Sequence, residues 1–467
     1  MQITNNIRTG CTLMNELLRN IPQVEKLLQE NEIAAFIPVI GRSNVTSITR
    51  KCTEKFRADL RAGAEADPST LKSMIVSACT EKRKEKIQRV INCTGVIIHT
   101  NLGRAPLGDD IFQKLKEEIS GYCNLEFSIP EKKRGKRGGF AEELICTITG
   151  GEDALIVNNN ASSVFLILKE FAEGKEAIVS RGELIQIGGG FRIPDIMAHS
   201  GAKLVEVGTT NITTLNDYQS VINENTSMLF SAHTSNFRLE GFTESPSLKE
   251  LASLKNNNVI FVRDLGSGNL TETRISNFEQ TVFSELSQGP DLVCFSGDKL
   301  LGGGQAGIIT GKKDLIARLR KNPLMRMLRV DKITYTILQE TLLKYVNSEE
   351  ERIELRSMIT RKTDDVSRVV NRFIKMCAPE NDMLKKVKIN GTFGGGSMPG
   401  KEIESYGVEV NASGKSPDEV YDYFLSCIPP VTGIVQEGKF ILNFLTVFEK
   451  DMKNLAAAVK GLGGGKR

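Results

Sequence analysis

Apolar residues recur at helical spacing in the first 62 residues of the chain. The positions that set this pattern are Leu17, Leu18, Ile21, Val24, Leu27 and Leu28. Spacings of three and four residues place side chains on one face of a helix, so the pattern predicts short amphipathic helices. The stretch 63–68 predicts a break, and charged residues at 82–86 predict a linker helix. We therefore expect a helical N-terminal domain over residues 1–75.

Short β-rich runs alternate with helical segments between residue 91 and about residue 330. The runs are 177–179, 203–207, 227–230, 259–262, 292–295 and 307–309. This alternation predicts a mostly parallel sheet with helices on both faces, and thus an α/β catalytic domain over residues 76–330. Helical stretches at 333–345 and 353–373, followed by strands and a final helix, predict a smaller α/β domain over residues 331–467.

Composition narrows the class of protein. The chain has 467 residues, of which 40% are hydrophobic and 25% charged, enough for two or three domains with a substantial core. It has no apolar run of about 18 residues and no basic N-terminal region followed by an apolar core, so we expect neither a membrane span nor secretion. Nine cysteines without a Cys-x-x-Cys pair, and three histidines, predict a protein of the reducing cytoplasm without a zinc site.

The excess positive charge lies in the N-terminal region of the chain. The net charge is only +4, but residues 1–90 carry 15 basic and 10 acidic residues. A modest basic excess is typical of a solvated surface, and it is also typical of a face that contacts nucleic-acid phosphates. The residues alone leave both interpretations open.

The candidate chemistry begins at the ends of two apolar strands. Lys299 follows the strand 293–296 and precedes the glycine-rich stretch 302–304, a setting typical of a lysine that forms a Schiff base. Asp264 follows the strand 259–262, where a carboxylate can hold a pyridinium nitrogen protonated. The alternatives are a solvated turn lysine and a turn-capping aspartate. Together the two residues predict pyridoxal 5'-phosphate (PLP) as cofactor.

A third strand end predicts a phosphate site. The strand 154–157 is followed by three asparagines and Ala161, and then by an apolar, helix-compatible run. Small polar residues at the start of a helix leave backbone N–H groups free to bind an anion. The alternative is an ordinary Asn or Ser cap.

Several longer blocks resemble one known family, the bacterial L-seryl-tRNA(Sec) selenium transferases, or selenocysteine synthases. The resemblance covers nearly the whole chain. The blocks that carry it are 91–95, 99–104, 158–161, 180–183, 191–195, 207–211, 233–236 and 296–303.

The resemblance implies a fold type I PLP-dependent transferase, similar to aspartate aminotransferase, with a small helical N-terminal domain that binds tRNA. It also implies the conversion of L-seryl-tRNA(Sec) to L-selenocysteinyl-tRNA(Sec) with selenophosphate, through a PLP-bound aminoacrylyl intermediate. Lys299 would hold PLP and remove the α-proton, and Asp264 would keep the ring protonated. A cytoplasmic homo-oligomer, a decamer built as a ring of dimers, is implied as well.

Further site residues are implied by the same resemblance. Arg104, Arg326 and Arg329 would bind the selenium donor, since a guanidinium group pairs two anionic oxygens at once. Arg326 and Arg329 are three residues apart and would share a helix face, although an exposed basic helix edge is the alternative. His233 would stack on the ring or be a core histidine. The remaining cofactor-binding candidates are Asn159, Asn160, Ala161 and Ser296.

The chain departs from the family pattern at five positions, which are Gln186, Ile212, Ile434, Asn443 and Leu445. These changes remove three arginines and two acids, and they keep two alternatives open. One is a PLP-dependent lyase that acts on a small amino acid or a phosphorylated amino sugar. The other is a non-catalytic tRNA-binding protein.

Overall fold

The chain divides into two compact units, Met1–Val90 and Ile91–Arg467. The structure, a computed structural model, describes residues 18, 21–62, 67–187, 190–234, 236–272, 275–276 and 279–463. Leu17 and most of the break expected at 63–68 lie outside these residues. Within the described ranges, no helix is both long enough and apolar enough to cross a membrane.

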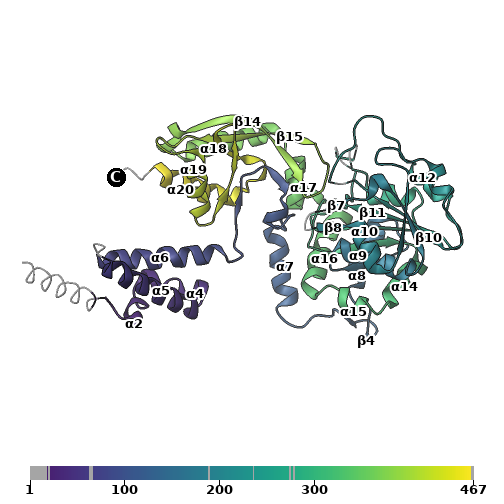
Figure 1. The fold of residues 1–467 in the computed structure, drawn as a ribbon, viewed down its shortest axis with the longest axis horizontal. Coiled ribbons are helices and arrows are strands. Elements are labelled where there is room, and N and C mark those ends of the chain that lie inside the picture. Colours follow the sequence, from purple (N-terminus) through teal and green to yellow (C-terminus); the bar gives the residue numbers. More distant parts are fainter. Residues whose placement is uncertain are drawn as a thin grey trace, which may run out of the picture. The chain divides into compact units, whose positions relative to one another are not determined.

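The first unit is helical, which confirms the helices predicted from the apolar spacing (Figure 1). Its helices are α2 (Val24–Leu27), α3 (Asn31–Ala34), α4 (Ile37–Ile40), α5 (Arg42–Arg61) and α6 (Pro68–Lys84). Phe56 and Leu60 on α5 pack with Leu71 and Ile75 on α6 in a small apolar core. The domain boundary expected after residue 75 falls inside α6, and the compact unit continues to Val90.

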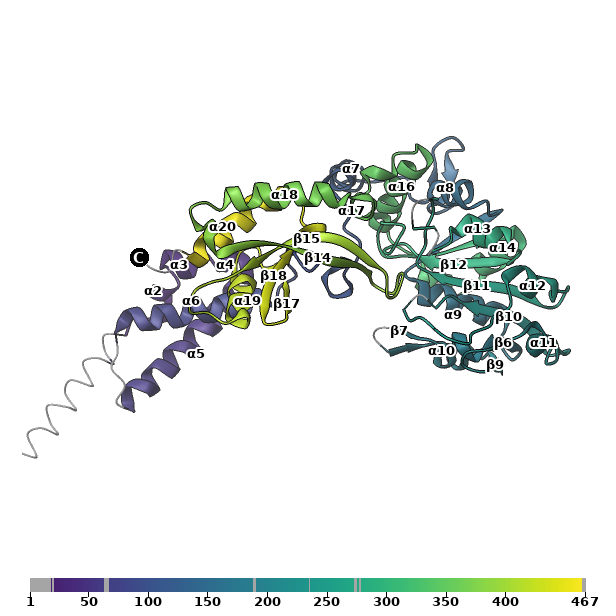
Figure 2. The ribbon, with the colours of Figure 1, turned by 90° about the horizontal axis from the view of Figure 1, so that it is seen from above.

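The second unit contains a seven-stranded sheet with the strand order β5-β13-β12-β11-β10-β6-β9. Its strands are β5 (Asp153–Val157), β6 (Glu176–Ser180), β9 (Lys203–Val207), β10 (Thr226–Ala232), β11 (Ile260–Gly266), β12 (Leu292–Ser296) and β13 (Gly307–Gly311). Only β13 runs antiparallel to its neighbours, because the short connection from β12 contains no crossover helix. The predicted mostly parallel sheet is therefore confirmed (Figure 2).

Helices cover both faces of this sheet because successive strand residues point to opposite sides. One layer packs against Leu155 and Val157 and consists of α9 (Asn160–Phe171), α10 (Ile193–Ser200) and α14 (Lys313–Lys321). The other packs against Ile156 and Phe295 and includes α8 (Gly139–Thr149), α13 (Val282–Ser287) and α16 (Lys332–Val346). On that second side, toward the β9 edge, lie α11 (Leu215–Gln219) and α12 (Leu248–Ser253).

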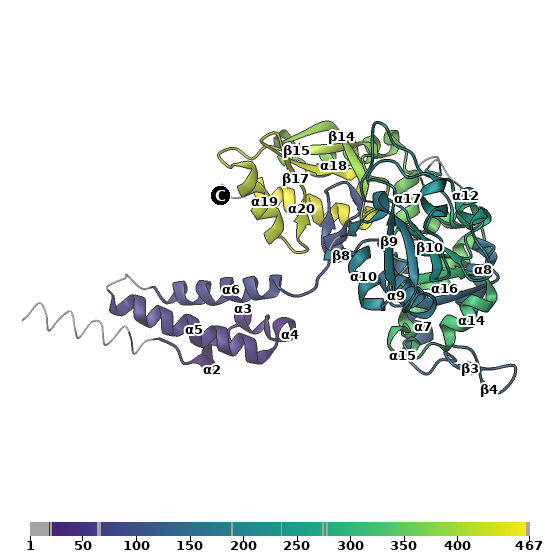
Figure 3. The same cartoon turned by 45° about the vertical axis from the view of Figure 1, so that its right-hand side comes forward.

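A second sheet of five strands has the order β17-β18-β15-β14-β2. Figure 3 shows its strands β14, β15 and β17. Its strands are β2 (Val96–Ile98), β14 (Leu384–Gly394), β15 (Glu402–Val410), β17 (Ile434–Gln436) and β18 (Lys439–Asn443). The helices α18 (Thr363–Met376), α19 (Pro417–Ser426) and α20 (Met452–Gly463) contribute Phe373, Phe424 and Val459 to a core shared with the strand residues Val408 and Leu442.

Two segments pack in a different domain from the one expected. Strand β2 pairs with β14, and β1 (Ile91–Asn92) pairs with β16 (Val431–Thr432), so the start of the expected catalytic domain completes the smaller one. Conversely, α16 packs on α8 and α7 (Asp109–Ile119), within the core of the large sheet. These contacts join segments that are distant in sequence, and local apolar spacing contains no signal for them.

Short elements complete the second unit. They are the hairpins β3 (Phe127–Ser128) with β4 (Lys133–Arg134) and β7 (Gln186–Ile187) with β8 (Phe191–Arg192), and the helices α15 (Met325–Leu328) and α17 (Glu354–Thr360).

Candidate active site

The predicted strand-end residues converge on one edge of the large sheet. Asp264 is paired in register with Ala232, the last residue of β10 before His233, and with Cys294 on β12. Gly307 is paired with both Val157 and Ser296. The carboxyl ends of β5, β10, β11 and β12 therefore meet, as ligand sites of open α/β sheets do.

Lys299 is a buried amine in the turn after β12. Its residue is 6% exposed, and the turn is held by the Leu300 N–H, which donates to the Ser267 carbonyl at 2.9 Å. Burial lowers the pKa of Lys299, while the negative charge of Asp264 opposes this change. A desolvated lysine with a lowered pKa is the nucleophile that imine formation with an aldehyde requires.

Asp264 is a buried carboxylate with one oxygen already engaged. Its Oδ1 accepts from Asn160 Nδ2 at 2.7 Å and lies 3.7 Å from Cys294 Sγ. Burial raises the pKa of Asp264, and the Asn160 amide and the Lys299 charge act in the opposite direction. Burying an anion costs free energy unless a cation or a hydrogen-bond donor faces it. The second carboxylate oxygen, Oδ2, is therefore suited to a protonated ring nitrogen.

The start of α9 fits an anionic group. Asn159 caps the helix, with its side-chain oxygen accepting from the Ser162 N–H at 2.9 Å. Ser163 Oγ and Asn160 Oδ1 are buried and have no hydrogen-bond partner among the described residues. A hydroxyl donor without a partner, next to the positive end of a 12-residue helix, is suited to a phosphate.

Gly307 allows this loop to approach the sheet closely. A Cβ at position 307 would lie 2.1 Å from the Asn159 carbonyl oxygen and 2.4 Å from Ser163 Oγ. Only a glycine fits between β13 and the start of α9, so this residue type allows the two segments to lie this close together.

Arg104 reaches the lysine turn from a distant part of the chain. Its Nη1 donates to Asp298 Oδ2 at 2.7 Å, directly beside Lys299, and its backbone adopts a left-handed conformation with φ of 63°. Asp298 Oδ1 is buried and has no hydrogen-bond partner within the described part of the chain. The strand-end pattern does not single out Asp298, although its place next to Lys299 is a signal that could have found it.

Arg326 and Arg329 do not share a helix face as expected. Helix α15 ends at Leu328, and Arg329 is extended and forms an isolated bridge with Val157. The short helix ends where the Asn158 N–H donates to the Leu328 carbonyl, at 2.8 Å. Both arginines nevertheless lie on a segment bound to the loop that starts α9.

His233 follows β10 and is anchored to Asp264, because its N–H donates to the Asp264 carbonyl at 2.8 Å. Burial lowers the pKa of its imidazole to about 4, so the ring is neutral at physiological pH. Its Nδ1 lies 3.7 Å from Oε1 of Glu279, a buried acid that the sequence patterns do not reveal because it follows no strand.

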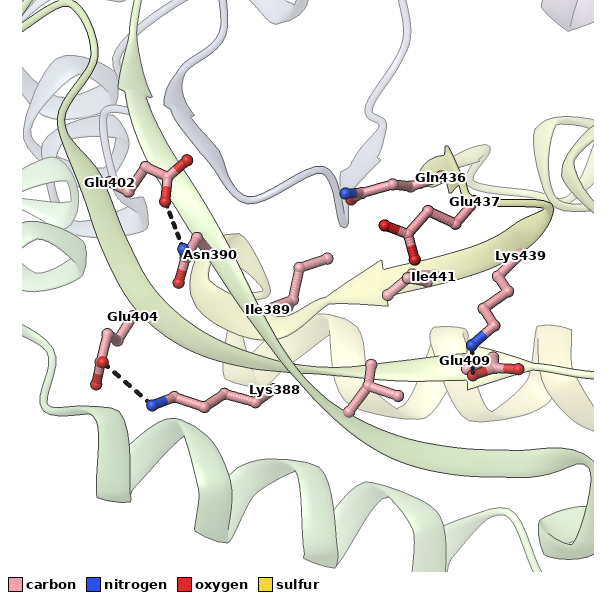
Figure 4. A pocket seen from close by; sticks show the side chains of 11 residues that line it. Lys388, Ile389, Asn390, Glu402, Glu404, Glu409, Gln436, Glu437, Lys439 and Ile441 are labelled. Carbon is pink, nitrogen blue, oxygen red and sulfur yellow. Dashed lines mark hydrogen bonds and ion pairs between the residues drawn. The ribbon is translucent and has the colours of Figure 1, made fainter.

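A second pocket lies on the small sheet, formed by β14, β15, β17 and β18 (Figure 4). Both lysines that line it are paired with acids of the same pocket. Lys388 Nζ lies 3.1 Å from Glu404 Oε1, and Lys439 Nζ lies 3.5 Å from Glu409 Oε2. Neither a buried nucleophile nor a helix N-terminus lines it, so the edge of the large sheet is the stronger candidate site.

The fold is that of the fold type I PLP-dependent enzymes. The solved structure of D-glucosaminate-6-phosphate ammonia-lyase has a similar fold, with a TM-score of 0.57 and 19% identity over 81% of this chain and 96% of that one.

Sequence comparisons identify the family. Residues 90–448 match the L-seryl-tRNA selenium transferase family, and residues 18–57 match the N-terminal segment of selenocysteine synthases. The L-seryl-tRNA(Sec) selenium transferase of Carboxydothermus hydrogenoformans is 39% identical over 94% of this chain and 96% of its own length. That of Aquifex aeolicus is 40% identical over 96% and 99%. The chain belongs to the L-seryl-tRNA selenium transferase family.

Proposed function

We propose that the protein converts L-seryl-tRNA(Sec) to L-selenocysteinyl-tRNA(Sec), with selenophosphate as the selenium donor. The observation that carries this proposal is the buried pair of Lys299 and Asp264 at one strand edge, in a chain that matches its named relatives over nearly their full length. A protein that only bound tRNA would have no use for a buried lysine with a lowered pKa.

Each residue of the candidate site has a distinct proposed role in the reaction of the seryl group. Bound PLP supplies an electron sink for the charge that develops at the serine α-carbon. Lys299 Nζ would hold the cofactor aldehyde and would be the base that takes the α-proton of the serine. Asp264 would keep a proton at the ring nitrogen. His233, Asn159, Asn160, Ala161 and Ser296 would complete the cofactor site.

Three arginines are proposed to bind the selenium donor. Arg104 is held beside Lys299 by its ion pair with Asp298, which places a guanidinium group next to the reacting centre. Arg326 and Arg329 lie on the segment bound to the start of α9, where Arg329 Nη1 is 3.7 Å from Glu126 Oε1 and would have to exchange this partner for the donor. A phosphate-containing donor pairs well with such planar cations.

The helical N-terminal unit is proposed to bind tRNA, in line with its basic excess. We place the reaction in the cytoplasm, where charged tRNA is made, and propose a homo-oligomer, a decamer built from dimers. The exposed apolar side chains Tyr122, Phe127, Ile129 and Phe140, clustered around β3 and α8, support an interface between subunits.

Incubation with seryl-tRNA(Sec) and selenophosphate tests the proposal. We expect mass spectrometry of the esterified amino acid to show selenocysteine with the natural chain and serine with the Lys299→Ala variant. If the natural chain returns serine unchanged while it consumes a free amino acid or a phosphorylated amino sugar, the protein is a lyase and the proposal is wrong.

A further inference from the structure

Glu183 is an acid for which the proposed reaction has no role. It ends the block 180–183, one of the blocks that resemble the family. A short 3-10 helix, Arg181–Glu183, follows β6 at this point. The register of β6 with β10 extends only to Ile178 and Leu229, so the last residues of β10 lie beyond it. The N–H groups at this end of β10 that face β6 need another acceptor.

Both carboxylate oxygens of Glu183 bind the end of β10. Oε1 accepts from the Ser231 hydroxyl at 2.9 Å, and Oε2 accepts from the Ala232 N–H at 3.1 Å. Toward β11, the His233 N–H donates to the Asp264 carbonyl at 2.8 Å. Glu183 therefore supplies the acceptor that a neighbouring strand provides elsewhere in a sheet.

The local sequence places this carboxylate at the strand end. Ser180 caps the 3-10 helix, because its Oγ accepts from the Gly182 N–H at 3.2 Å. A Cβ at position 182 would lie 2.9 Å from the Thr210 carbonyl oxygen, so a glycine allows the helix to approach the segment that follows β9. The block 180–183 thus has a structural reason, which is to present Glu183 to β10.

A buried arginine binds the same hydroxyl group as Glu183. Arg263 Nη1 donates to Ser231 Oγ at 2.7 Å, and Arg263 Nε donates to Glu285 Oε2 at 2.9 Å. Arg263 is 8% exposed, and Ser231 is its partner in the register of β10 and β11. Since the Ser231 hydroxyl accepts from Arg263, its single proton is free to bind Glu183. A continuous series of hydrogen bonds therefore holds the end of β10.

The Ala232–His233 segment is bound on both sides as a result. Glu183 binds the N–H of Ala232, and the Asp264 carbonyl binds the N–H of His233. The rotamers open to a side chain depend on its backbone dihedrals, so a fixed backbone also limits the orientation of the His233 ring. Glu183 and His233 line the same cavity. A change at Glu183 should thus reach the ring through the backbone of β10.

We propose that Glu183 is a positioning residue that acts through His233: its carboxylate fixes the end of β10 and thereby the orientation of the His233 ring. The role in catalysis rests on the proposed function, in which His233 helps to complete the cofactor site. The two hydrogen bonds from β10 to Glu183 belong to the chain itself, so they can be measured without cofactor and without turnover.

Amide hydrogen–deuterium exchange of the chain without cofactor tests these hydrogen bonds. Glu183→Met keeps the length of the side chain but removes both acceptor oxygens, whereas Glu183→Gln keeps one oxygen that can still bind the Ala232 N–H. We expect the Ala232 amide to exchange about tenfold faster or more in Glu183→Met, and close to the natural rate in Glu183→Gln. Equal exchange in Glu183→Met and the natural chain overturns the proposal. Glu183→Ala replaces Glu183→Met if the latter does not fold.

A double-mutant cycle tests whether Glu183 acts through His233. Titration of PLP, followed by absorbance and by circular dichroism of the bound cofactor, gives a Kd and a spectrum for each variant. We expect Glu183→Met to weaken the cofactor Kd about threefold or more and to change the spectrum, and Glu183→Gln to restore both. In the His233→Ala background, Glu183→Met should add no further change. The same change in both backgrounds would show that Glu183 acts by another route, and the proposal would be wrong.

Glu206→Gln is the matched control. Glu206 is exposed on β9, and its Oε2 accepts from Arg181 Nε at 3.1 Å, so it binds the same block without the carboxylate that holds β10. Its change should leave both the exchange of Ala232 and the cofactor spectrum unaltered. If Glu206→Gln speeds the exchange of Ala232 as much as Glu183→Met does, loosening of the block is responsible and Glu183 has no specific role.

The outcomes separate this inference from the proposed function. A chain that forms selenocysteinyl-tRNA but shows no effect of Glu183→Met on exchange overturns this inference alone. A chain that shows the expected exchange and cofactor results but returns seryl-tRNA unchanged overturns the proposed function alone.

Discussion

Lys299 and Asp264 illustrate how two buried charges coexist at one strand edge. Desolvation favours the neutral form of each group, and the attraction between them opposes it. A cofactor that brings an aldehyde to one and a cationic nitrogen to the other relieves both costs. A ligand with these two groups is therefore expected to stabilise the pair. Lys299 and Asp264 would contact different atoms of it, so their roles can be tested separately.

Replacing Lys299 by alanine removes the amine that would hold the cofactor and take the proton. We expect turnover of seryl-tRNA to fall about a thousandfold or more, as for loss of a group essential to covalent catalysis. Borohydride treatment followed by peptide mass spectrometry should give a reduced cofactor adduct at residue 299 in the natural chain and none in the variant. An adduct at another lysine would contradict the assignment.

Replacing Asp264 by asparagine leaves the shape of the site but removes the charge that retains the ring proton. We expect kcat to fall by about a hundredfold or more, with the cofactor still bound and its absorbance maximum shifted. Cys294→Ser is the control, because its side chain also touches Asp264 Oδ1, and a hydroxyl there can still donate. Equal losses in the two variants would argue that packing, and not charge, is responsible.

At the residue scale, sequence patterns predict the polar residues that come directly after an apolar strand. Lys299, Asp264 and Asn159 are of this kind. Glu279 lies in an irregular connection and has no local signal. Asp298 has one in its place next to Lys299, but its contact with Arg104 joins residues 194 positions apart, so local patterns do not predict the pairing. The departures at Asn443 and Leu445 are explained by packing, since Asn443 accepts from Ser405 Oγ and the Leu445 N–H, and Leu445 is fully buried.

At the scale of elements, the close approach of β13 to the start of α9 brings the proposed phosphate site near the end of β12, which the Lys299 turn follows. Gly307→Ala would push its methyl group into the Asn159 carbonyl and Ser163. We expect a loss of stability of about 1–3 kcal/mol and a weaker cofactor Kd, measured by thermal unfolding and by absorbance titration.

Gly121→Ala is the control for this substitution. A Cβ at position 121 meets nothing within 4 Å, so stability and cofactor binding should both stay close to those of the natural chain. If Gly307→Ala lowered stability but left the cofactor Kd unchanged, the loop would not be the phosphate site.

The elements also show the limit of prediction from local patterns. Apolar runs and alternation predict the strands of the large sheet and its mostly parallel order, because both depend on neighbours in sequence. The antiparallel β13, the pairing of β2 with β14 and the packing of α16 on α8 depend on contacts between distant segments. For that reason the expected domain limits separate strands that share a sheet.

At the scale of the whole molecule, the candidate active site and the proposed tRNA-binding surface belong to different compact units. Helix α5 exposes Arg50 and Arg57, which are seven residues apart and therefore on one face, while Phe56 and Leu60 of the same helix are buried. Reversing both charges should weaken binding of seryl-tRNA at least about tenfold and reduce its dependence on salt, since fewer counterions are released.

The cofactor site should not respond to the same change. We expect the absorbance of the bound cofactor, and the adduct at Lys299, to be the same in Arg50→Glu/Arg57→Glu as in the natural chain. Arg50 and Arg57 belong to the first compact unit, whereas Lys299 belongs to the second. The matched control is Lys313→Glu/Lys321→Glu. Both lysines are exposed on α14, which packs on the large sheet, and the change in net charge is the same. Equal loss of tRNA affinity in both double variants would show that net charge alone attracts the tRNA, and the N-terminal unit would lose its proposed role.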